Sequence, residues 1–112
     1  MTDSAIAVVQ GTLELLVLKT LRSAGPLHGF AVLDFIRRAT DDRLVVEEGA
    51  LYPALHRMER RGWLSADWGL SETGRRAKYY TLTRDGEAAL EQAQRRWAEY
   101  VDAVARIAPE AG

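Results

Sequence analysis

The sequence of 112 residues contains no cysteine and only three prolines and two histidines. Without cysteine, the chain forms no disulfide and has no thiolate nucleophile or metal ligand, which fits a reducing compartment. No uninterrupted apolar segment approaches about 18 residues, so we expect no transmembrane helix. The first residues, Met1-Thr2-Asp3-Ser4, lack the positive charge that begins a signal peptide. These absences predict a cytoplasmic protein with no membrane partner.

The side chains that carry out catalysis are equally scarce. The sequence shows no paired nucleophile and base, no glycine-rich phosphate loop and no cluster of carboxylates. The acidic pairs Asp41-Asp42 and Glu47-Glu48 are interpreted as a loop and the start of a helix. His28 and His56 have no cysteine or carboxylate at metal-ligand spacing, and His28 is predicted to cap a helix instead. We therefore expect no enzyme, no metal site and no cofactor.

The whole chain has no large excess of positive or negative charge, but its charged residues are unevenly distributed along the sequence. The formal net charge is −1, whereas residues 49–83 hold six Lys or Arg against three Asp or Glu. That segment has a net charge of +3, which leaves −4 for the remainder. A near-neutral chain argues against a protein that covers DNA regardless of sequence. It does not argue against a sequence-specific binder, because such a protein needs positive charge only on its contacting surface.

Hydrophobic periodicity predicts helices over residues 11–24, 28–39 and 49–61, with Gly25-Pro26 and Gly62 as stops. The run Leu44-Val45-Val46 is short and β-branched, so it is predicted to be a small strand. Residues 63–69 and 77–82 alternate as a β-hairpin with a polar loop, and Thr83 caps a long helix reaching about residue 108. The order is helix, helix, strand, helix, strand, strand, helix. It predicts a mainly α winged helix-turn-helix with a β-hairpin over residues 1–83 and one long C-terminal dimerisation helix over residues 84–112.

Within the hairpin, Leu64, Ala66 and Trp68 share one face of the first strand. Trp63 and Trp68 are predicted to pack beneath the hairpin. Tyr79 and Tyr80 fit two interpretations: stacking platforms for single-stranded nucleic acid, or a strand that is half core. We favour the second because Tyr-x-Leu alternates as a half-buried strand does.

A basic helix followed by a hairpin with a basic tip is the layout with which winged domains contact DNA. The exposed face of the third helix would enter a major groove, and the hairpin tip would contact phosphates or a neighbouring minor groove. The alternative is a solvated basic surface, which is the default for any isolated basic helix. The predicted DNA-binding residues are Ala50, Tyr52, Pro53, His56, Arg57, Arg60, Arg75, Arg76 and Lys78. For Arg37 and Arg38, contact with the DNA backbone and ordinary solvent exposure are equally good interpretations.

The last helix carries an apolar stripe at alternating spacings of three and four residues, as in a coiled coil. So small a domain has no partner left for this stripe, so a second copy of the chain is predicted to cover it. The predicted dimer-interface residues are Leu90, Ala93, Trp97, Tyr100, Val101, Val104 and Ile107. Trp97 has two compatible interpretations: a core residue of the dimer, or a surface that stacks on a flat aromatic effector.

Several motifs resemble the PadR family of bacterial transcriptional regulators. They are Gly11-Thr12-Leu13-Glu14, Gly25-Pro26-Leu27-His28-Gly29-Phe30, the block from Gly49 to Leu64 that contains Leu51-Tyr52-Pro53-Ala54-Leu55, and the block from Gly74 to Gly86 that contains Tyr79-Tyr80-Thr81-Leu82-Thr83. The resemblance covers about residues 11 to 107. It implies a winged helix-turn-helix homodimer, usually a repressor, in the compact branch with a single C-terminal dimerisation helix. In some compact members of the family an aromatic residue on that helix lines a ligand pocket at the dimer interface, and Trp97 is the residue that this sequence would supply there.

The sequence therefore predicts a homodimeric regulator that binds a pseudo-palindromic double-stranded operator. Two alternatives from other classes stay open: a winged protein-interaction module that does not bind DNA, and a small-molecule carrier built on the apolar C-terminal stripe. Charge on the third helix and on the hairpin tip distinguishes the first alternative from the DNA-binding interpretation.

Overall fold

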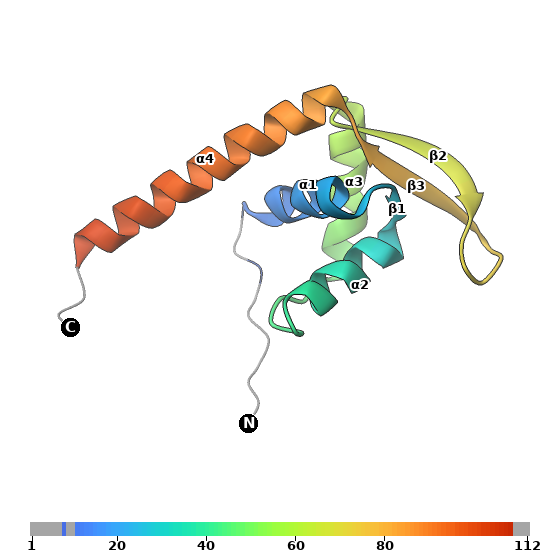
Figure 1. Cartoon of the computed structure of the whole chain (residues 1–112), viewed down its shortest axis with the longest axis horizontal. Coiled ribbons are helices and arrows are strands. Elements are labelled where there is room, and N and C mark those ends of the chain that lie inside the picture. Colours follow the sequence, from blue (N-terminus) through green and yellow to red (C-terminus); the bar gives the residue numbers. More distant parts are fainter. Residues whose placement is uncertain (1–7, 9–10, 109–112) are drawn as a thin grey trace.

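The computed structural model describes residue 8 and residues 11–108. In this part of the chain, four helices accompany a small antiparallel sheet whose strand order is β1-β3-β2, and the β2–β3 hairpin projects beyond the helices (Figure 1). The helices are α1 (Leu13–Ala24), α2 (Gly29–Ala39), α3 (Glu48–Arg60) and α4 (Arg84–Ile107), and the strands are β1 (Leu27–His28), β2 (Leu64–Leu70) and β3 (Arg76–Leu82). The predicted fold class, a mainly α winged helix-turn-helix with a long last helix, is confirmed. The outer limits predicted for the two regions, residues 1 and 112, lie outside the described residues.

Glycines and polar caps end and begin the helices where the sequence predicts. Gly25 follows α1 with φ 77° and Gly62 follows α3 with φ 83°, which is the left-handed region that favours glycine. The Nδ1 atom of His28 accepts a hydrogen bond from the backbone N–H of Ala31 at 3.2 Å, so His28 caps α2 as predicted. The hydroxyl of Thr83 accepts one from the backbone N–H of Gly86 at 3.0 Å and caps α4.

The strand that joins the hairpin in the sheet is not the one predicted. Residues 44–46 form no strand; only Leu44 makes an isolated bridge, and Val46 is buried in the core instead. The hairpin is joined by β1, where Leu27 pairs with Tyr80 and His28 pairs with Tyr79. The prediction was wrong because β-branched composition describes a local preference, whereas a two-residue strand exists only through its distant partner.

One hydrophobic core joins the three short helices to the sheet and to the start of α4. Leu18 of α1, Leu51 and Leu55 of α3 and Leu90 of α4 are all completely buried in it. The prediction that Leu90 lies at a dimer interface is therefore wrong, because a side chain with 0% exposure in one copy has no surface left for another. Ala93, one turn further along, is partly buried against the same core.

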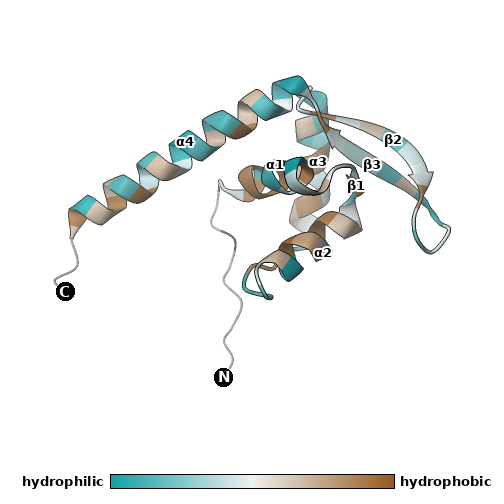
Figure 2. Cartoon of the chain, viewed as in Figure 1, coloured by the Kyte–Doolittle hydropathy of each residue, from teal (hydrophilic) through white to brown (hydrophobic). Residues whose placement is uncertain are grey.

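The start of α4 is fixed firmly to the hairpin. A Cβ atom added to Gly86 would lie 2.2 Å from the carbonyl oxygen of Trp63, so only glycine allows this approach. The C-terminal part of α4 extends away from the other helices (Figure 1). Apolar residues recur along this extension (Figure 2), and its exposed large side chains are Trp97, Tyr100, Val101, Val104 and Ile107. Among the described residues, no helix combines the length and apolar character needed to cross a bilayer.

Candidate nucleic-acid interface

Helix α3 divides into a buried and an exposed face, as its periodicity predicts. Leu51, Ala54, Leu55 and Met58 are buried. The exposed residues are Ala50, Tyr52, Pro53, His56, Arg57 and Arg60. Pro53 lies in the second turn of α3, so it withholds one backbone hydrogen bond from the helix. The six α3 residues predicted to contact DNA thus all lie on its exposed side.

Two arginines at the C-terminal end of α3 share a carboxylate that the sequence did not reveal. Glu14, in the first turn of α1, lies 3.1 Å from a guanidinium nitrogen of Arg61 and 3.8 Å from Nε of Arg57. The charge of Arg57 is therefore partly compensated within the protein. Arg60 has no carboxylate partner among the described residues, so its positive charge is fully available to a ligand.

Tyr52 braces α3 against the start of α2 as well as facing solvent. A Cβ atom on Gly29 would lie 2.5 Å from a ring carbon of Tyr52, so Gly29 leaves the space that this ring occupies. Burial raises the pKa of the Tyr52 hydroxyl above its usual value, and the charge of Glu48 adds to the shift. The phenol therefore stays a neutral hydrogen-bond donor at neutral pH.

The hairpin of β2 and β3, which we call the wing, ends in an ordered turn. The backbone N–H of Ser71 donates to the carbonyl of Arg75 at 2.8 Å, and that of Gly74 donates to the carbonyl of Ser71 at 2.9 Å. Gly74 has φ 82°, which a residue with a side chain rarely adopts. This turn presents Arg75 and the first residue of β3, Arg76, at the end of the wing. Arg75 has no carboxylate partner in the part of the chain that the structure describes.

Lys78 connects the wing to α3. Its Nζ lies 3.0 Å from a carboxylate oxygen of Glu59, and this hydrogen bond raises the pKa of the lysine above its usual value. Lys78 also lies above the ring of Tyr80, with Nζ 5.7 Å from the ring centroid. Tyr80 is buried, as the half-core interpretation of the strand predicts, and burial raises the pKa of its hydroxyl. Lys78 thus holds the wing in place, with part of its charge compensated.

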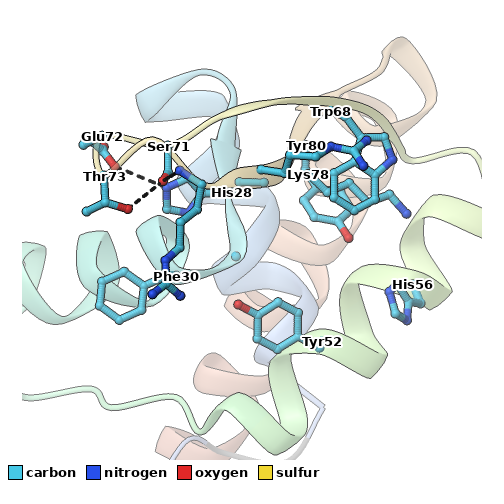
Figure 3. A pocket seen from close by; sticks show the side chains of 14 residues that line it. His28, Phe30, Tyr52, His56, Trp68, Ser71, Glu72, Thr73, Lys78 and Tyr80 are labelled. Atoms are coloured by element: carbon cyan, nitrogen blue, oxygen red, sulfur yellow. Dashed lines mark hydrogen bonds and ion pairs between the residues drawn. The ribbon is translucent and has the colours of Figure 1, made fainter.

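Between the wing, the start of α2 and α3 lies an open groove of about 720 Å³ (Figure 3). Five of the nine predicted DNA-binding residues line it: Tyr52, His56, Arg75, Arg76 and Lys78. The other four, Ala50, Pro53, Arg57 and Arg60, lie on the exposed side of α3 outside the groove. The structure therefore brings the wing tip and one side of α3 together and leaves the rest of α3 projecting beside them.

The lining of the groove also includes residues that the sequence interpretation did not assign to it, among them Phe30, Trp68 and Glu72. The prediction that Trp68 packs beneath the hairpin was wrong, since its side chain is 60% exposed. Alternation correctly placed Trp68 on the same face as Leu64 and Ala66, but it does not say where the covering layer of helices ends. Trp63, by contrast, packs against the core as predicted, with the Arg61 guanidinium 4.9 Å from its ring centroid.

The wing tip also approaches the N-terminus of α2. Nε2 of His28 is buried and lies 3.5 Å from a carboxylate oxygen of Glu72, with no closer partner among the described residues. A backbone hydrogen bond within Glu72, followed by the contact with His28, lowers the pKa of this carboxyl. His28 also meets the ring of Tyr79 edge-on at 5.2 Å. These contacts hold the tip of the wing over the start of α2.

A second hollow, of about 410 Å³, lies between the start of α1 and the middle of α4. Trp97 and Tyr100 form one wall, with their rings stacked at a centroid distance of 6.0 Å. Leu15 and Arg96 also line the hollow. Trp97 and Tyr100 therefore belong both to this hollow and to the apolar stripe of α4 that is predicted to meet a second copy.

Comparison with known proteins agrees with this geometry. Residues 17–92 match the family model described as the transcriptional regulator PadR-like family. A transcriptional regulator from Clostridium thermocellum is 28% identical to this chain, with a TM-score of 0.79 over 88% of this chain and 94% of that one. A PadR family regulator from Eggerthella lenta is 31% identical, with a TM-score of 0.74 over 88% and 82% of the two chains. A PadR-like transcription factor from Bacteroides fragilis is 35% identical, with a TM-score of 0.70 over 88% and 91%. The chain therefore belongs to the PadR-like family of transcriptional regulators, which are not enzymes.

Proposed function

We propose that this protein is a homodimeric repressor that binds a pseudo-palindromic operator. The observation that carries this proposal is a single surface that combines the exposed face of α3 with a wing whose tip presents Arg75 and Arg76. Arg60 on α3 and Arg75 on the wing have no carboxylate partners among the described residues, so both charges are available for phosphates. Each α3 would enter the major groove of one half-site, with the wing on the adjacent backbone. Because DNA is the proposed partner, the cytoplasm is the proposed location.

The distal part of α4 supports the homodimer. Trp97, Tyr100, Val101, Val104 and Ile107 are exposed large apolar side chains on one extended helix. A contiguous apolar surface of this kind costs free energy in water and marks an interaction site. Two copies packed through this stripe would present two α3 helices to one face of a duplex. We therefore divide the chain into a DNA-binding region up to residue 83 and a dimerisation helix after it, with about the first three turns of α4 sharing the core of the former.

Selection of bound fragments from random-sequence DNA tests this function. We expect enrichment of an inverted repeat whose half-site centres lie about 10 base pairs apart, or a multiple of that spacing. A promoter carrying the enriched site should then be less active when the protein is present, whereas higher activity would indicate an activator. If no sequence is enriched at low salt, DNA is not the ligand, and a protein-interaction module becomes the better interpretation.

We further propose that a flat aromatic effector binds beside Trp97 in the dimer. The hollow of about 410 Å³ and the stacked Trp97–Tyr100 pair support this site, because an aromatic ligand can extend an existing stack. An effector that binds the two dimer states unequally would change the angle between the two DNA-binding regions. The prediction is that aromatic compounds quench tryptophan fluorescence in the wild type but not in Trp97→Phe, with Trp68→Phe as the control. Equal quenching in the Trp97→Phe variant would place any ligand elsewhere.

A further inference from the structure

The most exposed tryptophan of the described residues lies within the candidate interface. Trp68 occupies the middle of β2, opposite Lys78 in β3. On the same face, Leu64 is buried and Ala66 is half-buried, whereas Trp68 is 60% exposed because the wing has extended past the helices by this point. The core therefore gives no reason for a tryptophan at this position. Figure 3 shows its ring in the groove, near Lys78 and Tyr80.

Trp68 does have one specific partner, which is the guanidinium of Arg76. The central carbon of this guanidinium lies 4.6 Å from the centroid of the indole ring, within the range of a cation–π interaction. The two residues are diagonal neighbours on one face of the hairpin, since Arg76 pairs with Leu70 and Lys78 pairs with Trp68. A diagonal separation is within reach of long side chains. The indole thus restricts Arg76 to the side of the wing that borders the groove.

The partner of Arg76 is an uncharged ring, whereas other cations of this surface face carboxylates. Arg57 and Lys78 each face a carboxylate, so part of their charge is already compensated. Arg76 has no carboxylate partner among the described residues, and its partner is a neutral ring. A neutral ring leaves the positive charge of the guanidinium in place and leaves most of its five N–H donors available. The guanidinium is therefore held in position but remains free to bind an anion.

We propose that Trp68 is a positioning residue that holds Arg76 toward the groove, where this arginine binds a phosphate of the DNA strand passing between the wing and α3. Three other side chains of the groove suit such a strand, since His56 and Arg75 supply donors and Phe30 supplies an apolar surface, whereas the carboxylate of Glu72 lies at the wing tip beside His28. This inference rests on the proposed DNA-binding function. It adds that an uncharged residue controls one of the phosphate contacts.

The salt dependence of operator binding tests this role, because its slope counts the phosphates that the protein neutralises. Arg76→Ala removes one charge from each subunit, so the slope should fall by about 2 per dimer, with an affinity loss of about 30-fold at 0.15 M salt. Trp68→Ala removes no charge, yet it should lower the slope by more than half as much. The double variant should bind no more weakly than Arg76→Ala alone, because the two residues act as a unit.

Further variants separate the role of the ring from that of apolar bulk. Trp68→Phe keeps an aromatic face and should retain most of the slope, whereas Trp68→Met keeps bulk without a ring and should behave like Trp68→Ala. Leu70→Ala is the matched control, since Leu70 is exposed on the same face of β2 and has no ring. Thermal unfolding of each variant shows whether the wing is still folded.

Two outcomes would overturn the positioning role while leaving DNA binding intact: a wild-type slope in Trp68→Ala, or losses in log affinity that add in the double variant. If the slope of Trp68→Ala is that of the wild type but its affinity is lower, Trp68 contacts DNA directly instead of positioning Arg76. If the wild-type protein itself binds no DNA, the proposed function fails first.

Discussion

Exchanging Arg60 and Arg75 together for alanine is expected to weaken operator binding by about a thousandfold at 0.15 M salt. A dimer loses four charges in this variant, and each phosphate contact contributes roughly 1 kcal/mol at that salt concentration through counterion release. The slope of log affinity against log salt should fall by roughly 3 to 4. Neither arginine has an ion-pair partner among the described residues, so the free energy of unfolding should change little. Fluorescence anisotropy with labelled operator over a salt series measures both quantities.

The control for this variant exchanges Arg84 and Arg95 on α4 for alanine, which changes the net charge by the same amount. Both are exposed, and neither has an ion-pair partner in the described part of the chain. We expect the control to keep nearly all of the affinity and slope of the wild type. If the control and the Arg60–Arg75 variant lose affinity equally, net charge and not a defined surface determines binding.

Val104→Asp is expected to dissociate the dimer and to lower operator affinity by at least a hundredfold. Val104 is 50% exposed in one copy and lies on the distal part of α4, beyond the core. In the proposed dimer this substitution buries two carboxylates without partners, which costs several kcal/mol. A single copy would then contact only one half-site. Sedimentation velocity measures the association state, and operator titration measures the affinity.

Ala98→Asp introduces the same charge on the same helix, away from the apolar stripe, and is the matched control. We expect it to remain a dimer and to bind the operator like the wild type. Circular dichroism should show that both variants keep their helices, since neither residue belongs to the core. A monomeric wild type, or a Val104→Asp variant that still dimerises, would contradict an interface on the α4 stripe.

Local sequence patterns predicted the helices within about two residues because each has a clear apolar period and a recognisable end. Gly25 and Gly62 mark two helix ends through their positive φ angles, and His28 and Thr83 mark two beginnings through their caps. The same patterns misplaced the third strand. Strand β1 depends on pairing with Tyr79 and Tyr80, about 50 residues away, and nothing in the local sequence shows that pairing.

The sequence predicted which residues of the candidate site are exposed, but not which ion pairs they form. Periodicity identified which residues of α3 are exposed, and the polar loop identified the wing tip. Neither pattern could show that Glu14 faces Arg57 across 43 positions of the chain or that Glu59 faces Lys78. The exposure of Trp68 was missed for a related reason: strand alternation assigns a face, but only the folded structure shows that the helices no longer cover that face.

The carboxylates of Glu14 and Glu59 compete with any bound polyanion for the cationic side chains of this surface. If the proposed interface binds DNA, a duplex that engages Arg57 or Lys78 must displace these side chains from their own carboxylates, and we expect weaker attraction to arbitrary sequence as a result. A chromosome offers millions of irrelevant sites, and a regulator held tightly by all of them would seldom reach its target. A lower non-specific affinity would shorten the residence time on each non-specific site during the search. Sequence discrimination would then depend on the contacts that form only at the operator.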